Sequence, residues 1–172
     1  MSRRMDYVVA LDKPAPDLYV SFTSREYWED LVAEHARLYE STLTHFSSGA
    51  GGTDIVFTHT LSSKDLPSVA AAVVPLNLTV TREQHFDPFD AASNSARGHY
   101  KALVPSAPMD FGGTYVLCES STGSELRLNS VCTVKVPLIG GKIEEWVLGG
   151  LHGLFDNERD FTRDWIAGHY QN

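Results

Sequence analysis

The feature that most constrains the fold is a long stretch at the carboxyl end with apolar residues on one side only. After Pro137, apolar residues recur at spacings of three, four and seven, which predicts one amphipathic helix over residues 139–169 with an apolar side of Ile143, Val147, Leu151, Leu154, Phe161, Trp165 and Ile166. The other side carries Glu144, Glu145, Asp156, Arg159, Asp160, Arg163 and Asp164. A helix of this length spans about 45 Å. It can bury its apolar side only by lying across a large sheet.

The rest of the chain supplies strands for such a sheet. Alternating apolar residues predict strands at 7–11, 37–46, 53–61, 76–86, 95–104, 113–121 and 125–136. In the last strand, one face should point toward the terminal helix, namely Leu126, Leu128, Ser130, Cys132, Val134 and Val136. Residues 16–22 predict a short helix, and a capping box over 23–26 predicts a second that ends near His35. Residues 65–73 are compatible with helix or loop.

This order of one strand, two short helices, six strands and a long helix resembles the START-like helix-grip superfamily of birch-pollen-allergen, lipid-transfer and polyketide-cyclase proteins. The resemblance covers residues 7 to about 169. It implies a single START-like domain over 1–172 with an α+β fold. In this fold a curved antiparallel sheet of about seven strands wraps the C-terminal helix, two short helices follow the first strand, and a hydrophobic cavity lies between sheet and helix.

Three local segments narrow the resemblance. The strand at 7–11, the helix start Thr-Ser-Arg-Glu-Tyr-Trp at 23–28 and the segment Val-Pro-Leu-Ile-Gly-Gly-Lys-Ile-Glu at 136–144 look like an actinobacterial START-like family of uncharacterised function. That family supplies no established catalytic residue, so none is transferred to this chain.

Composition limits the partners. The chain has 172 residues, of which 42% are hydrophobic, and a formal net charge of −8 without a basic stripe. This argues against nucleic acid and anionic membranes as partners. The longest apolar runs, such as residues 69–76, are too short for stable membrane insertion, and no signal peptide is recognisable, so we expect a cytoplasmic protein. The oligomeric state stays open.

The two cysteines fit a reducing compartment. A hairpin turn at 121–124 would place Cys118 opposite about Leu128, four residues from Cys132 on the same strand. Four residues of strand span about 13 Å, whereas a disulfide needs Cα atoms within about 7 Å. Both cysteines are therefore expected to be reduced.

No motif for a metal or cofactor is present, and none is expected to bind. The seven histidines form no metal-binding pair, and neither cysteine belongs to a C-x-x-C motif. The glycines at 49–52 lack the Lys and Ser/Thr of a phosphate-binding loop, and there is no G-x-S-x-G nucleophile motif.

The candidate site is therefore the cavity under the terminal helix. Gly150 and Gly153 either leave room there for a ligand or permit close packing of helix on sheet. Alternation along 76–86 puts Arg82 inward, where it either orients a polar group of a ligand or reaches solvent at the end of the strand. The expected lining residues are Phe57, Leu78, Val80, Arg82, Leu128, Ser130, Cys132, Val134, Val147, Gly150, Leu151, Gly153 and Leu154.

Three functions are compatible with this cavity. The favoured one is non-catalytic binding or transport of a small hydrophobic or amphipathic, lipid-like ligand. The second is an enzyme of the cyclase or hydratase type that acts on a polyketide-like substrate, which converging acid–base residues would favour. The third is a structural or interaction protein whose core is filled.

Overall fold

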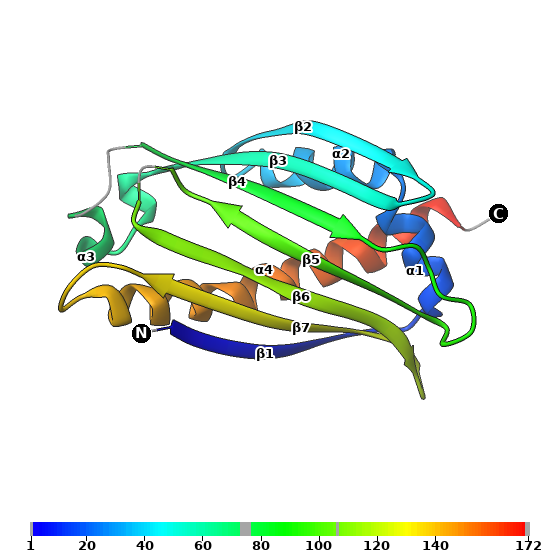
Figure 1. Ribbon diagram of the computed structural model, residues 1–172. Coiled ribbons are helices and arrows are strands. Elements are labelled where there is room, and N and C mark those ends of the chain that lie inside the picture. The colour runs from blue at the N-terminus through cyan, green and yellow to red at the C-terminus, as the bar shows by residue number, and fades with distance from the viewer. Residues whose placement is uncertain (1, 73–76, 106, 171–172) are drawn as a thin grey trace.

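One curved antiparallel sheet and one long helix dominate the computed structural model, which describes residues 2–72, 77–105 and 107–170. The strands, in the order β1-β7-β6-β5-β4-β3-β2 across the sheet, are β1 (Ser2–Leu11), β7 (Gly123–Val134), β6 (Met109–Ser120), β5 (Ser95–Leu103), β4 (Asn77–Phe86), β3 (Gly52–Ser62) and β2 (Glu40–Gly49). The helices are α1 (Ala15–Phe22), α2 (Arg25–His35), the short α3 (Ser68–Ala71) and α4 (Gly140–His169), with a 3₁₀ turn at Ser63–Asp65. Figure 1 shows α4 running diagonally behind the sheet. The predicted helix-grip fold is confirmed.

The register of β7 follows the predicted alternation. Leu128, Ser130, Cys132 and Val134 are buried, whereas Arg127 and Lys135 on the other face are exposed. On α4 the buried apolar residues are Ile143, Leu148, Leu151, Phe155, Trp165 and Ile166. Val147, Leu154 and Phe161 of the predicted apolar side are only partly buried. Glu144 was assigned to the polar side, but it is 1% exposed and belongs to the interior.

Several predicted boundaries need correction. The second strand starts at Glu40 rather than at residue 37, because turns that follow α2 occupy residues 36–39. The capping box at 23–26 does not form, because Thr23 is the C-cap of α1, where its hydroxyl donates to the Tyr19 carbonyl, and Ser24 is the N-cap of α2 without a side-chain bond. The ambiguous segment 65–73 contains α3, while Val73 and the expected strand start Leu76 lie outside the described residues.

The cysteines are free but placed differently from the prediction. The turn between β6 and β7 is tighter, with Ser120 paired with Gly123, so Cys118 lies opposite Glu125 and not Leu128. Cys132 lies seven residues beyond Glu125, which is about 23 Å along the strand and on the opposite face. No disulfide can join them in this fold.

Two glycines let tyrosine rings lie flat against the inner face of the sheet. Gly98 on β5 pairs with Tyr115, and Gly113 on β6 pairs with Tyr100. A Cβ at Gly98 would come within 2.2 Å of the Tyr115 ring, and one at Gly113 within 2.8 Å of the Tyr100 ring. Only glycine allows this close approach. The two rings are stacked, with centroids 6.3 Å apart, and they occupy part of the space under the sheet.

Candidate ligand cavity

A hollow lies between the inner face of β3–β6 and α4. It has a volume of about 300 Å³, and we call it the outer cavity. Its walls are mostly apolar and include Leu61, Leu66, Leu78, Val80, Ala102, Met109, Phe111, Val147, Leu151, Leu154 and Phe155. Tyr39 and Trp146, which are 38% and 41% exposed, line it together with the exposed Gly150 and mark where it opens to solvent.

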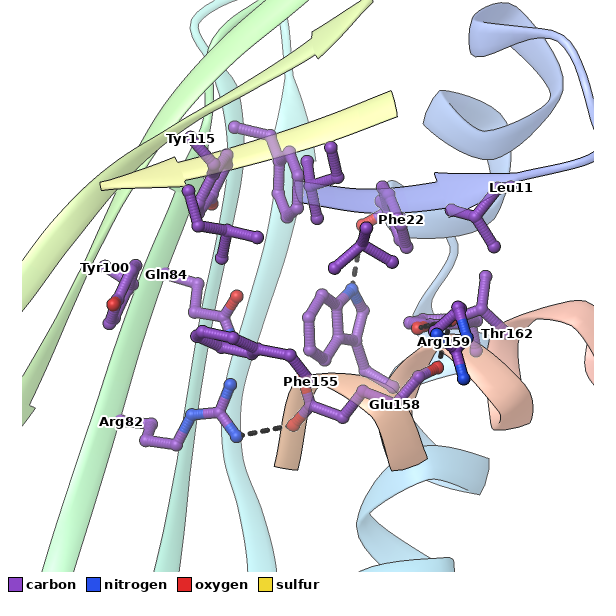
Figure 2. Close-up of a pocket in the computed structure, with 16 residues that line it drawn as sticks. Leu11, Phe22, Arg82, Gln84, Tyr100, Tyr115, Phe155, Glu158, Arg159 and Thr162 are labelled. Carbon is purple, nitrogen blue, oxygen red and sulfur yellow. Dashed lines mark hydrogen bonds and ion pairs between the residues drawn. The ribbon is translucent and has the colours of Figure 1, made fainter. Parts of the chain in front are cut away.

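A smaller space of about 60 Å³, the inner chamber, lies further along the same layer (Figure 2). Leu11 of β1, Phe22 of α1, Tyr115 of β6 and Leu128 of β7 contribute to its walls. Arg82, Tyr100 and Phe155 line both spaces and so form the wall between them.

The predicted lining residues divide into groups. Leu78, Val80, Arg82, Val147, Gly150, Leu151 and Leu154 surround the outer cavity. Leu128 lines the inner chamber, and Val134 lines a third small pocket of about 50 Å³ beside Leu78 and Val147. Their contact with a ligand stays a prediction.

Four of the expected positions lie elsewhere. Phe57 and Cys132 are fully buried in the core behind the cavity walls. Ser130 is fully buried, and its hydroxyl is hydrogen-bonded to that of Tyr100, so it does not present a free polar group. Gly153 is exposed, and nothing lies within 4 Å of a Cβ built there. Unlike Gly150, Gly153 is not among the residues that line the outer cavity.

A charged pair lies where the outer cavity meets the inner chamber, with Arg82 lining both spaces and Glu158 lining the inner chamber. Arg82 of β4 donates from Nη1 to Oε1 of Glu158 on α4 at 2.7 Å, as the dashed line in Figure 2 shows, and both side chains are largely buried. The guanidinium also lies over the Phe57 ring, 4.7 Å from its centroid. Arg82 therefore points inward as the alternation predicts, and it does not reach solvent.

Two histidines complete this polar cluster, and the prediction did not include them. His35 at the end of α2 has Nε2 3.6 Å from Oε1 of Glu158, and its ring centroid is 5.0 Å from that of His59 on β3. Both rings line the outer cavity. The alternation of Phe57, His59 and Leu61 on β3 was the available signal for His59, whereas the place of His35 depends on how α2 packs.

Burial and neighbouring charges set the protonation of the cluster. Burial lowers the pKa of His59 to about 4, with the charges of Arg82 and His35 acting in the same direction. Burial also lowers the pKa of His35. For Glu158, burial alone would raise the pKa, but the charge and hydrogen bond of Arg82 outweigh it and lower the pKa. At neutral pH the cluster therefore holds one cation, one anion and two neutral imidazoles.

Two buried polar atoms around these spaces lack a protein partner. Nδ1 of His35, beside the outer cavity, and Nε2 of Gln84, in the inner chamber, make no hydrogen bond among the described residues. Figure 2 shows Gln84 and Arg82 projecting into the same space. Buried polar groups are normally hydrogen-bonded, so both atoms are available to water or to a ligand.

One group of three side chains in the described part of the chain has the spacing of metal ligands. It consists of Glu26, Asp30 and His169, all exposed, and its residues do not line the outer cavity. His169 and Glu26 are 3.5 Å apart and Asp30 accepts from the Trp165 indole, which are ordinary surface contacts.

A family model described as "Protein of unknown function (DUF2505)" matches residues 6–166. The chain belongs to this family. Uncharacterized proteins of Mycobacterium tuberculosis and Mycobacterium bovis are each 28% identical to it over 97% of this chain and 98% of their own length. These relatives are actinobacterial, as the resemblance implied.

Solved structures share the fold at low sequence identity. TTHA0849 of Thermus thermophilus has a TM-score of 0.58 at 12% identity and covers 99% of this chain and 100% of its own. Ara h 8.0201 has a TM-score of 0.55 at 11% identity and covers 94% of this chain and 98% of its own. Norcoclaurine synthase of Thalictrum flavum, solved with dopamine and hydroxybenzaldehyde, has a TM-score of 0.54 at 14% identity. The match covers 100% of this chain and 90% of that protein's chain. At these identities the likeness concerns the fold alone.

None of the helices in the described ranges combines the length and the apolar character that crossing a bilayer requires.

Proposed function

We propose that this protein binds a small apolar or amphipathic, lipid-like molecule in the outer cavity without converting it. The observation that carries the proposal is the cavity itself, with about 300 Å³ enclosed by mainly apolar walls. This volume is at the lower end of the range of small-molecule sites, about 300–1,000 Å³. An apolar cavity of about 150 Å³ already holds benzene in another protein.

The distribution of polar groups supports an amphipathic ligand. The walls contributed by β5, β6 and α4 are apolar, whereas Arg82, His35 and His59 gather at the inner end. A few polar groups in an otherwise apolar pocket fix the orientation of a ligand. A protein of the same fold was solved with dopamine and hydroxybenzaldehyde, which supports the fold as a host for small organic molecules.

A cavity-filling variant tests the proposal. Ala102 lines the cavity and is 5% exposed, whereas its neighbour Lys101 is on the outer face of the same strand. Ala102→Phe should weaken binding of the neutral fluorescent probe 1-N-phenylnaphthylamine by about tenfold or more, which is about 1.4 kcal/mol. Lys101→Phe is the control and should bind as the unmodified protein does. Absence of probe binding to the unmodified protein, or equal binding by a folded Ala102→Phe protein, would refute the proposal.

A second candidate function is acid–base catalysis of the cyclase or hydratase type. The convergence of Arg82, Glu158, His35 and His59 at one end of the cavity favours it. However, an effective general base has a pKa near the working pH, and the pKa of about 4 at His59 lies well below neutral. Hydration of α,β-unsaturated thioesters that is lost in His59→Gln would support catalysis. Binding of such a thioester without turnover would exclude this reaction.

We also propose that the chain acts as one cytoplasmic domain. The free cysteines support a reducing compartment, since Cys132 is fully buried as a thiol. Fractionation of cells that express the protein would test this, and recovery from the extracellular medium would contradict it.

A further inference from the structure

The polar cluster at the inner end of the outer cavity is balanced in charge, and this limits what it can accept. Arg82 and Glu158 form one ion pair at 2.7 Å, and their side chains are 11% and 18% exposed. Apart from the two histidines, Arg82 is the one ionisable cation or anion that lines the outer cavity among the described residues, and Glu158, which lines the inner chamber, neutralises it. A ligand that brings a net charge would therefore leave that charge uncompensated in a largely buried place.

Hydrogen-bond donors remain available at Arg82. A guanidinium has five N–H donors, and only Nη1 of Arg82 has a protein acceptor among the described residues. Figure 2, which draws the residues of the inner chamber, shows the second terminal nitrogen directed away from Glu158 and toward Phe155, whose side chain lines both spaces. This side of the guanidinium can donate to an oxygen atom of a ligand.

A hydrogen-bond acceptor is available at His59. The Ser41 hydroxyl contacts the carbonyl oxygen of Tyr39 at 3.2 Å and Nδ1 of His59 at 2.7 Å. A hydroxyl has one proton, and we assign it to the Tyr39 carbonyl, which can only accept. In this tautomer Nδ1 of His59 donates to Ser41 and the lone pair lies on Nε2. His59 is therefore an acceptor at the cavity.

The donor and the acceptor lie close together on the sheet. Arg82 pairs with Phe57 across β3 and β4, and His59 is the next residue on the inner face of β3. The rings of Phe57 and His59 have centroids 5.1 Å apart, and the Arg82 guanidinium lies over the first of them. One small group can reach both partners, directly or through a bridging water.

We propose that the outer cavity selects apolar molecules that end in an uncharged hydroxyl, such as long-chain alcohols, over the corresponding carboxylates and amines. A hydroxyl accepts from Arg82 and donates to His59. A carboxylate would lie near Glu158 and have no proton for His59, and an ammonium would lie near Arg82. The inference rests on the proposed binding function and specifies the ligand class for the same site.

The test compares ligands that share one alkyl chain. Decanol, its methyl ether, decanoate and decylamine displace 1-N-phenylnaphthylamine from the protein near neutral pH. Decanol should bind about tenfold or more tightly than decanoate and decylamine, with the ether weaker than the alcohol because it lacks a proton. Equal affinities for the alcohol and the carboxylate would overturn the inference and leave probe binding intact. Absence of probe binding would instead refute the proposed function.

Removal of the anion should reverse the preference. In Glu158→Gln the positive charge of Arg82 is no longer compensated, so decanoate should bind about tenfold more tightly than before and exceed decanol. Asp164→Asn makes the same change in net charge at an exposed position of α4 and should leave the order unchanged. An unchanged order in Glu158→Gln, or a reversed order in Asp164→Asn, would contradict the inference.

A second variant keeps the test valid if Glu158→Gln does not fold. His59→Phe removes the acceptor and retains a ring of similar shape. Decanol should then bind no better than its methyl ether, while the affinity of the ether stays within about twofold. An alcohol that keeps its advantage over the ether in a folded His59→Phe protein would exclude the proposed contact.

Discussion

At the scale of the residue, Arg82 illustrates how a charge is kept inside an apolar layer. It is held by an ion pair to Glu158 from another element and by the face of Phe57 from a neighbouring strand. Removing one partner of such a pair leaves a buried charge, which is costly. The sites most sensitive to substitution are therefore polar residues in the interior, as well as apolar ones.

The histidines of the cluster should make stability depend on pH. The pKa of His59 is lowered from 6.5 to about 4, so between these values the unfolded chain binds a proton that the folded protein does not. The contribution of the neutral His59 ring to stability is fully present above about pH 6.5 and is lost as the pH drops toward 4. The shift in the pKa of His59 limits the loss of folding free energy to about 3 kcal/mol. The actual loss is smaller because solvent screens the partly exposed ring.

Urea unfolding at several pH values measures this dependence. His59→Gln should show a smaller loss of stability than the unmodified protein over that range. His45→Gln, which changes an exposed histidine of β2, is the control and should retain the full dependence. Identical pH profiles for His59→Gln and the unmodified protein would contradict the assignment.

Two glycines of α4 separate helix propensity from ligand binding. Gly150 and Gly153 are exposed, and an added Cβ meets nothing within 4 Å at either position, but only Gly150 lines the outer cavity. Leucine at either position should raise stability by up to about 1 kcal/mol. Only Gly150→Leu should also change probe affinity. Calorimetry and probe titration of both variants check this, and equal effects on binding would contradict it.

At the scale of the element, α4 both closes the core and forms one wall of the cavity. Its first turns are fixed to the end of β7, because the buried Glu144 carboxylate accepts from the Val134 amide at 2.9 Å. Arg3 of β1 lies 3.9 Å from the same carboxylate. This contact holds the helix in place beside the region where Val147 and Leu151 line the cavity.

Loss of this contact should destabilise the protein. Glu144→Ala leaves the Val134 amide without an acceptor in a buried place, which typically costs about 1–3 kcal/mol. In a chain of this size, each 1 kcal/mol lowers the melting temperature by about 2–4 °C. Glu145→Ala is the matched control, since the Glu145 side chain is 71% exposed and forms a 3.7 Å ion pair with Arg3, and it should change stability by less than about 0.5 kcal/mol. Similar losses in both variants would show that burial of Glu144 does not matter.

Periodicity predicted the elements well because α4 and every strand except β2 bury residues on one face. The alternation of apolar residues alone predicted which face of β7 is buried. It also predicted that Arg82 on β4 points inward. The buried position of Glu144 did not follow from periodicity, since its acceptor role depends on the end of a strand ten residues away in sequence. The Thr23 capping box failed because Thr23 ends α1, where its hydroxyl donates to the Tyr19 carbonyl, and Ser24 is the N-cap of α2.

The cavity was predicted less completely because several elements enclose it. Residues of β4 and α4 could be expected from periodicity. Met109 and Phe111 were missed because β6 begins at Met109 rather than at residue 113, and Tyr39 was missed because it lies in the turns that follow α2. The glycines of α4 suggested room for a ligand beside Gly153, yet that position is exposed to solvent. A glycine pattern shows where side chains are missing, and the tertiary structure decides whether that space lies inside.

At the scale of the whole molecule, the sheet and α4 enclose a core that also protects reactive groups. Cys132 on β7 is fully buried between β1 and β6, and burial raises the pKa of its thiol to about 11, with the charge of Glu144 adding to the effect. Cys118 on the outer face is partly exposed. The Cys118 thiol can therefore react in the folded protein, whereas the Cys132 thiol can react only when the core opens.

Thiol labelling under native and denaturing conditions measures this difference. Under native conditions one thiol per chain, Cys118, should react quickly, and Cys132 should react only as fast as the core opens. After denaturation without reductant, both thiols should react. Cys118→Ala isolates the slow signal. Rapid labelling of that variant in the folded state would contradict the packing of β7.

The pairing of β1 with β7 also determines the order in which the chain can fold. Ser2 and Thr133 are bonded across these strands although they lie 131 positions apart, whereas every other strand pair in the sheet joins neighbours in sequence. Distant contacts close slowly because the loop between them must first be ordered. During synthesis β1 leaves the ribosome before the other strands of the sheet and has no strand partner until β7 follows. We therefore expect the first strand made to be the last one paired, with Val9 and Leu11 exposed throughout that interval.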